Sequence, residues 1–195
     1  MEILIFAETD DKGNLKKDAY EIASYASEIS SENGGNVNAL CFNASNAESL
    51  SDYGVDKIIN SKNEELKNFD PSNYSKCITE VFNNEECNLL VLSSSSNSKH
   101  IGGILSVLTD SSYVTNVISK LTNGEKMTVV RNTFTNKAFE TVEINKNKII
   151  LAISKNSFGL KEKPVKSEVV EINFSIPESR NKVKSIDRAT NKVTI

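Results

Sequence analysis

Short apolar runs alternate with segments of helical periodicity along residues 1–122, and this alternation constrains the fold more than any other feature. The first run, Ile3-Leu4-Ile5-Phe6-Ala7, is followed by apolar residues at helical spacing that stop before Asn33-Gly34-Gly35; they are Leu15, Ala19, Ile22, Ala23, Ala26 and Ile29. A short apolar run is typical of a buried strand, and glycine after a periodic segment is typical of a helix end. Because strand–helix–strand crossovers are right-handed, the repeats predict an α/β fold: a mostly parallel sheet with helices on both faces.

The same pattern predicts the other elements of this half of the chain. The expected strands are Val37 to Phe42, Val55 to Ile59, Leu89 to Leu92 and Tyr113 to Ile118. The expected helices are Ala44 to Asp52, one that opens at Asp70-Pro71 with Tyr74, Ile78, Val81 and Phe82 inward, and one with Ile101, Ile104, Leu105 and Leu108 inward.

The pattern changes after Leu121, where no helical segment separates the strands. Met127 to Phe134, Ala138 to Ile144 and Lys148 to Ile153 read as consecutive strands, joined by turns at Thr135-Asn136-Lys137 and Asn145-Lys146-Asn147. Short polar turns between β-prone runs predict an antiparallel β addition to the sheet.

Residues 161–195 differ from the rest in composition. They are polar, contain Pro164 and Pro177, and end on the strand-like Lys192-Val193-Thr194-Ile195. We therefore expect a domain over residues 1–160 and a linker or edge segment over residues 161–195. This segment carries eight basic and five acidic residues, or +3, so the total of −3 leaves −6 on residues 1–160.

Composition excludes several classes of function. The net negative charge of residues 1–160 argues against a nucleic-acid-binding surface. No apolar stretch approaches the roughly 20 residues that span a bilayer. The amino terminus lacks a basic leader, so we expect a cytoplasmic protein. Cys41, Cys77 and Cys87 are odd in number and set in apolar contexts, which favours reduced core thiols. With a single histidine, His100, a structural metal site is not expected.

The loops after the strands are the places to look for chemistry, and they offer little. Residues 93–103, Ser93 to Gly103, combine hydroxyls with a helix start and could hold an anion, but helix capping explains a serine run better. Glu8 could act as a general base, although a residue there more often bridges a loop. His100 has no partner for a catalytic triad. Glycine-rich phosphate motifs are absent from the sequence, so we expect no catalytic residue in this chain.

Four segments resemble, in order and spacing, the amino-terminal domain of the electron transfer flavoprotein alpha subunit. They are Ile3-Leu4-Ile5-Phe6-Ala7-Glu8 with Gly13 and Leu15, Tyr53-Gly54-Val55-Asp56-Lys57-Ile58, Leu89-Leu90-Val91-Leu92-Ser93, and Val130-Arg131 to Ala138-Phe139-Glu140-Thr141-Val142. The resemblance covers about residues 1 to 160. It implies a Rossmann-like, adenine-nucleotide-hydrolase-like sheet. The chain departs from the family at Asn97-Ser98-Lys99-His100, where relatives usually carry a Gly-Arg-Asp type of turn.

The resemblance implies a role in electron transport as the alpha subunit of a heterodimer with a beta subunit. Such a protein takes electrons from acyl-CoA or other dehydrogenases to a quinone oxidoreductase or a similar acceptor, without substrate turnover of its own. Its FAD is bound mainly by a carboxy-terminal domain that would follow residue 195, so this chain alone would hold no flavin. Lys182 to Ile195 resembles the segment that leads into that domain.

Arg131, Phe134 and Phe139 are the residues that we expect at the interface with the beta subunit. An antiparallel extension with an arginine and two aromatic side chains is the kind of surface that an obligate partner covers. The alternative is that both phenylalanines complete the local core and that Arg131 pairs with a nearby carbonyl or carboxylate. Two other functions also stay open: a stand-alone nucleotide-binding protein of universal-stress type, and an interaction domain without a ligand.

Overall fold

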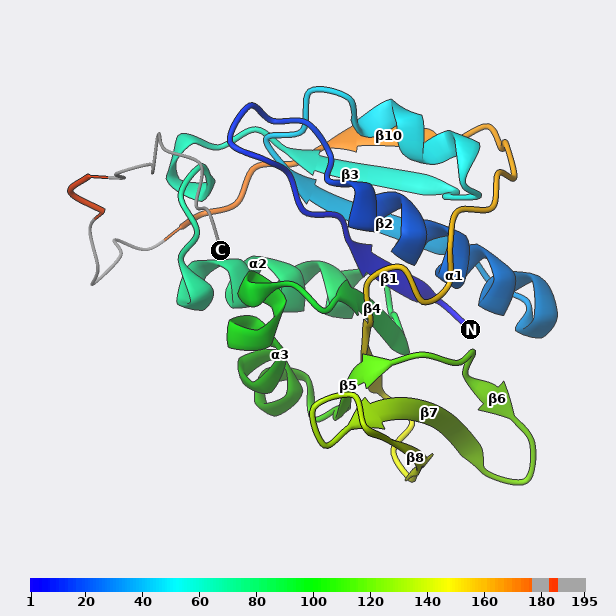
Figure 1. Cartoon of the computed structure of the whole chain (residues 1–195). Coiled ribbons are helices and arrows are strands. Elements are labelled where there is room, and N and C mark those ends of the chain that lie inside the picture. Colours follow the sequence, from blue (N-terminus) through cyan, green and yellow to red (C-terminus); the bar gives the residue numbers. More distant parts are fainter. Residues whose placement is uncertain (177–182, 186–195) are drawn as a thin grey trace, which may run out of the picture.

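A mixed sheet forms the centre of the protein. The structure, a computed structural model, describes residues 1–176 and 183–185, and within these the sheet has ten strands. The order is β10-β3-β2-β1-β4-β9-β5-β7-β6, with β8 paired to β7 (Figure 1). The strands are β1 (Ile3–Phe6), β2 (Val37–Phe42), β3 (Lys57–Ser61), β4 (Leu89–Ser93), β5 (Ser112–Val117), β6 (Thr122–Asn123), β7 (Met127–Thr133), β8 (Ala138–Ile144), β9 (Ile149–Ile153) and β10 (Glu168–Glu171). From β10 to β5 the pairings are parallel, and those of β7 are antiparallel, which confirms the predicted α/β class.

Helices cover both faces of the sheet, as predicted. They are α1 (Lys17–Asn33), α2 (Pro71–Asn84) and α3 (Ser96–Thr109), with short 3-10 helices η1 (Ala47–Asp52) and η2 (Glu64–Leu66). One buried cluster lies on the side of α1, and a second lies on the side of α2 and α3. β1 and β9 contribute alternate residues to the two clusters along their whole length, so every residue of these two strands is apolar.

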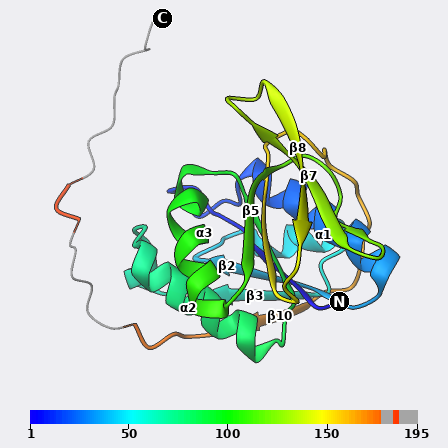
Figure 2. The same cartoon turned by 90° about the horizontal axis from the view of Figure 1, so that it is seen from below.

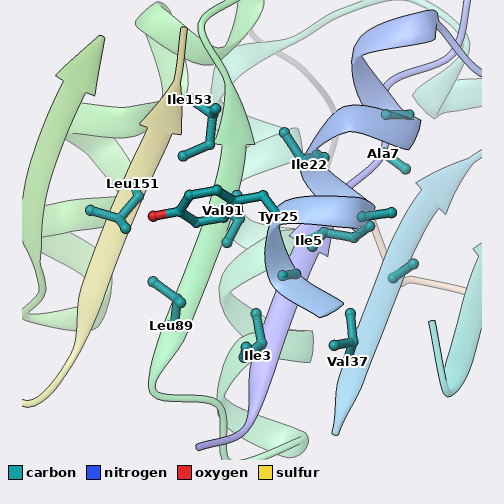
Figure 3. Packing of buried hydrophobic residues seen from close by; sticks show 14 of the residues in the cluster. Ile3, Ile5, Ala7, Ile22, Tyr25, Val37, Leu89, Val91, Leu151 and Ile153 are labelled. Atoms are coloured by element: carbon teal, nitrogen blue, oxygen red, sulfur yellow. The ribbon is translucent and has the colours of Figure 1, made fainter. Parts of the chain in front are cut away.

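Tyr25 is the largest side chain buried on the α1 side. It extends from α1 across the sheet, close to Val91 of β4 and Leu151 of β9 (Figure 3). Its hydroxyl donates to the carbonyl oxygen of Ser119, at 3.2 Å, and accepts from the Leu121 N–H, at 3.0 Å. The first helix is therefore tied to the segment that leads into the antiparallel part of the sheet.

The strand expected at Lys148 to Ile153 does not join the antiparallel addition, and that prediction is wrong. β9 lies inside the parallel sheet, between β4 and β5, and pairs parallel with both. All five of its residues are buried. A continuous apolar run such as Ile149-Ile150-Leu151-Ala152-Ile153 fits a central strand that is covered on both faces. A strand of the exposed ribbon would instead have one polar face.

Residues 161–176 pack against the domain. β10 extends the sheet beyond β3, and Phe174 is 7% exposed in the cluster on the α2 side. The expected edge segment therefore contains a strand, β10, that forms one edge of the sheet. The predicted domain boundary at residue 160 stays a prediction. Residues 177–182 and 186–195 lie outside the described part, and with them the strand expected at Lys192 to Ile195.

Two other elements differ in detail from the expectation. Ala44 to Asp52 was expected to be a short helix, and only Ala47–Asp52 is helical, as a 3-10 turn. α1 begins at Lys17, because Leu15 still forms a β-bridge with Thr9. Such loop contacts cannot be told from helical spacing alone.

Candidate functional site

The strand order reverses at β1, because β2 lies on one side of it and β4 on the other. Ligands of open α/β sheets usually bind at this reversal, beyond the carboxyl ends of the strands. Here the loops after β1 and β4 bring Glu8 against the first turn of α3. This position is the first candidate site.

The carboxylate of Glu8 fills that position. It is 6% exposed and accepts hydrogen bonds from the hydroxyls of Ser95 and Ser98, the latter at 3.1 Å. The Lys16 ammonium lies 2.8 Å away, and the Asn97 amide donates at 3.3 Å. Ser95 also caps α3 by accepting from the Ser98 N–H, at 3.0 Å. The geometry thus fits the bridging interpretation of Glu8 and the capping interpretation of the serine run.

Glu21 of α1 fills a second cradle at the same end of the sheet. It is 6% exposed, and its carboxylate accepts the backbone N–H groups of Asn156, Phe158 and Gly159 at 2.9, 2.8 and 3.1 Å. Backbone N–H groups that converge from one loop in this way form a concavity that favours an anion. The side chain of the protein itself supplies the anion and fixes the loop after β9 to α1.

The remaining candidates for chemistry are also accounted for by local contacts. His100 is exposed, and its Nδ1 lies 2.7 Å from the Ser96 carbonyl oxygen of the same helix. Cys41, Cys77 and Cys87 are buried free thiols, and burial raises the pKa of each to about 12, so the thiolate nucleophile is disfavoured. Among the described residues, no group of three His, Cys, Asp or Glu side chains could hold a metal ion.

The β7–β8 ribbon is the second candidate site, and its base is held firmly. Val129 and Ile144 are buried in the cluster on the α1 side. The Val130 N–H donates to the Ser119 hydroxyl at 2.8 Å, and Lys120 bridges to Glu28 and Glu32 of α1. The ribbon is therefore a fixed extension of the sheet that projects past the helices (Figure 2).

The outer part of the ribbon is exposed. Phe134 and Phe139 are 75% and 74% exposed, so neither completes the local core. Arg131 is paired: its Nε lies 2.8 Å from a carboxylate oxygen of Glu140, the residue opposite it in the ladder. Side chains alternate along a strand, and Phe139 is therefore on the face opposite to Arg131 and Glu140. The structure thus exposes the two aromatics but does not place Arg131 on the same face as Phe139.

The backbone at the ribbon tip is unusual. Phe134, Thr135 and Asn136 have φ angles of 47°, 55° and 61°, in the left-handed region, and the Lys137 N–H donates to the Phe134 carbonyl oxygen at 3.1 Å. Two central residues with positive φ give the tight turn that suits the twist of a hairpin. Asparagine adopts this region readily, whereas phenylalanine does so at a cost of about 1 kcal/mol or more.

A further apolar surface lies on α3. Ile104, Val107 and Leu108 are 38%, 82% and 48% exposed, whereas Ile101 and Leu105 are fully buried. The prediction that Ile104 and Leu108 face inward is wrong. The buried face of α3 consists of Ser98, Ile101, Gly102, Leu105 and Thr109, and the ring of Tyr113 lies directly against Gly102.

Sequence reasoning missed Glu21 and the role of Tyr25. Both lie in a helix whose apolar spacing is plain, and nothing local marks their partners, which lie 94 to 138 positions away along the chain. A glutamate at position 21, among apolar neighbours on the inner face, is the one available signal, because an acid there must find donors when buried.

Comparison with known proteins identifies the family. A family model described as "Electron transfer flavoprotein domain" matches residues 3–177. No curated protein matches the chain. Within the described residues, no helix is long and apolar enough to cross a bilayer. Since the family model covers most of the sequence, from β1 past β10, the chain belongs to the electron transfer flavoprotein family.

Proposed function

We propose that this chain is the amino-terminal domain of an electron transfer flavoprotein alpha subunit and that its ribbon is covered by a beta subunit. Proteins of the family carry electrons and work with a second flavoprotein subunit. The observation that carries the proposal is the ribbon itself, a fixed extension whose two phenylalanines are about three-quarters exposed. Exposed aromatic side chains on a rigid element are typical anchors of an interface.

The complete heterodimer would work in the cytoplasm. It would accept electrons from acyl-CoA or other dehydrogenases and pass them to a quinone oxidoreductase or a similar acceptor. This chain would contribute structure and partner contacts, and no substrate turnover of its own. The contacts of Glu8 and His100 support this division of labour. Glu8 is bonded to Ser95 and Lys16, and the ring of His100 contacts the Ser96 carbonyl oxygen of its own helix.

The described residues do not fit the flavin that the family implies. A dinucleotide needs a helix start or backbone N–H groups for its phosphates. At the strand reversal the start of α3 faces the Glu8 carboxylate, and the N–H groups after β9 face Glu21. The hollow beside the loop after β1 is lined by three acids, Asp10, Asp11 and Glu64, and by two lysines, Lys12 and Lys67, so it has no excess of positive charge that would favour a phosphate. We propose that FAD is held mainly by another domain of the heterodimer.

Expression of this chain alone and together with a beta subunit from the same organism tests the proposal. The chain alone should be colourless, and the two chains should co-purify. Replacing Phe134 or Phe139 by alanine should weaken the complex by about tenfold each, because each variant removes an exposed aromatic anchor. Arg131→Ala should have a smaller effect, since its partner is Glu140 of the same ribbon.

A visible flavin band at stoichiometric level on the isolated chain would contradict the proposed division between domains. If the wild-type chain fails to bind the beta subunit, the assignment to an alpha subunit is wrong. If the complex forms and none of the three variants weakens it, the beta subunit contacts another surface.

A further inference from the structure

The chain contains two Asn-Gly pairs, and the fold brings their asparagine side chains together. Asn33-Gly34 lies at the end of α1, and Asn123-Gly124 begins the turn between β6 and β7. The amide nitrogen of Asn123 donates to the side-chain oxygen of Asn33 at 3.2 Å. Figures 1 and 2 show this turn beside the carboxyl end of α1. Asparagine before glycine is chemically labile, because glycine lets the following backbone nitrogen approach the side-chain amide closely.

The two Asn-Gly pairs differ in how firmly they are held. Asn123 is exposed, and within the described residues its side chain makes one hydrogen bond, the bond to Asn33. Gly124 is exposed too, and a Cβ built there would have no other part of the described chain within 4 Å. Asn33 is half-buried in the last turn of α1, and its side chain is held at both ends. Its nitrogen donates to the Ile29 carbonyl oxygen at 3.0 Å, and its oxygen accepts from Asn123.

We propose that Asn123 is a site of spontaneous deamidation and that its side chain shields Asn33 from the same reaction. The Gly124 nitrogen attacks the side-chain carbonyl carbon of Asn123 and forms a C–N bond, and the amide nitrogen leaves as ammonia with the proton of the attacking N–H. Water then opens the cyclic imide at either carbonyl, which gives aspartate or its β-linked isomer. The reaction consumes water, releases ammonia and needs no oxidant or reductant. The inference does not rest on the proposed function.

Conversion of Asn123 changes its contact with α1 from attraction to repulsion. A carboxylate has no donor, so it faces the side-chain oxygen of Asn33 without a hydrogen bond. The new negative charge also lies near Glu32, which precedes Asn33 in α1 and is paired with Lys120. Asn33 then keeps only its bond within the helix, and its own conversion becomes faster. The fold therefore sets the order of the two reactions, with Asn123 first and Asn33 second.

Peptide mapping by mass spectrometry tests the proposal on the wild-type chain. The protein is incubated in mildly alkaline buffer, and the conversion of amide to acid is followed at both asparagines. Conversion at Asn123 should be at least about tenfold faster than at Asn33, because Asn33 has a further hydrogen bond and a helical backbone. In denaturant the two sites should convert at similar rates, since both lose the contacts of the fold. Equal rates in the folded chain, or a faster Asn33, would overturn the proposal.

Two substitutions separate the reactive site from the shield. Gly124→Ala hinders the attacking nitrogen and meets no neighbouring part of the described chain, so conversion at Asn123 should slow by at least about fivefold while the contact with Asn33 remains. Asn123→Ala removes the donor, and conversion at Asn33 should be about two- to tenfold faster than in the Gly124→Ala chain. Equal conversion of Asn33 in the two variants would show that the contact gives no shield. If Gly124→Ala leaves the rate at Asn123 unchanged, the route through the imide is wrong.

Discussion

The loops at the strand reversal and the β7–β8 ribbon differ in how many of their binding groups are open to solvent. At the reversal, Glu8 and Glu21 satisfy the helix start and the backbone N–H groups that a ligand would otherwise use. On the ribbon, two aromatic side chains and one edge of β8 remain open to solvent. The difference teaches that the region where this fold usually binds ligands is closed from within, and that the open surface of this chain lies elsewhere.

The largest effect should come from Glu21→Ala. The change leaves three backbone N–H groups without their acceptor at a site where Glu21 is 6% exposed, and we expect the free energy of unfolding to fall by about 2–4 kcal/mol. Denaturant unfolding measures it. Glu80→Ala, at an exposed position of α2, is the control and should change stability by less than about 0.5 kcal/mol. Equal effects of the two variants would show that Glu21 does not secure the loop after β9.

Glu8→Ala should cost about 1–3 kcal/mol, because it removes the acceptor of two buried hydroxyls and the partner of Lys16. Glu8→Gln is the matched variant: it keeps a carbonyl acceptor but loses the charge, and its loss should be smaller. A Glu8→Ala protein as stable as the wild type would show that the closed site at the strand reversal contributes nothing to folding.

A substitution at the ribbon tip should raise the free energy of unfolding, in contrast to the two changes at the strand reversal. Phe134→Gly relieves the left-handed backbone of an exposed phenylalanine, and we expect the isolated chain to gain up to about 1 kcal/mol. The same variant should weaken the complex with the beta subunit, since it removes an exposed anchor. Phe139→Gly, within β8, should instead lower stability by about 0.5–1 kcal/mol. A loss of stability in Phe134→Gly would mean that the ring is needed for the fold.

The smallest expected effect is the response to nucleotides. AMP, ATP and FAD should each shift the melting temperature of the isolated chain by less than about 0.5 °C, because a ligand raises stability only if it binds the folded state. The Glu21 and Glu8 carboxylates occupy the cradles that their phosphates would need. A saturable shift with AMP or ATP would support the stand-alone nucleotide-binding function and would show that the loops at the strand reversal are open to a ligand.

The parallel sheet could be predicted from the sequence because its strands are apolar runs separated by helical periods. The place of β9 could not, since strand order is a tertiary property: Ile149 to Ile153 follow the ribbon in the chain but pair with β4 and β5. Phe134 and Phe139 were expected at an interface, and the structure shows that they are exposed. Their pairing with a partner stays a prediction.

The partners of buried acids were also beyond sequence reasoning. Glu8 was expected to bridge a loop, and its bonds to Ser95 and Ser98 agree with that. The N–H groups that bind Glu21 lie more than 130 positions away along the chain. Such contacts depend on how whole elements pack, and hydrophobic spacing does not encode them.

The position of β9 has a consequence for the order in which the chain can fold during synthesis. β5 leaves the ribosome before β9, yet β9 must lie between β5 and β4, so the inner edges of both stay unpaired until residue 153 has emerged. At about 5–20 residues per second, the 36 positions from Val117 to Ile153 take about 2–7 s to translate. A hairpin closes in about 1–10 μs, so β7 and β8 can pair long before that time has passed. We expect the ribbon to act in the nascent chain as a spacer that turns the polypeptide back toward the vacant position between β4 and β5.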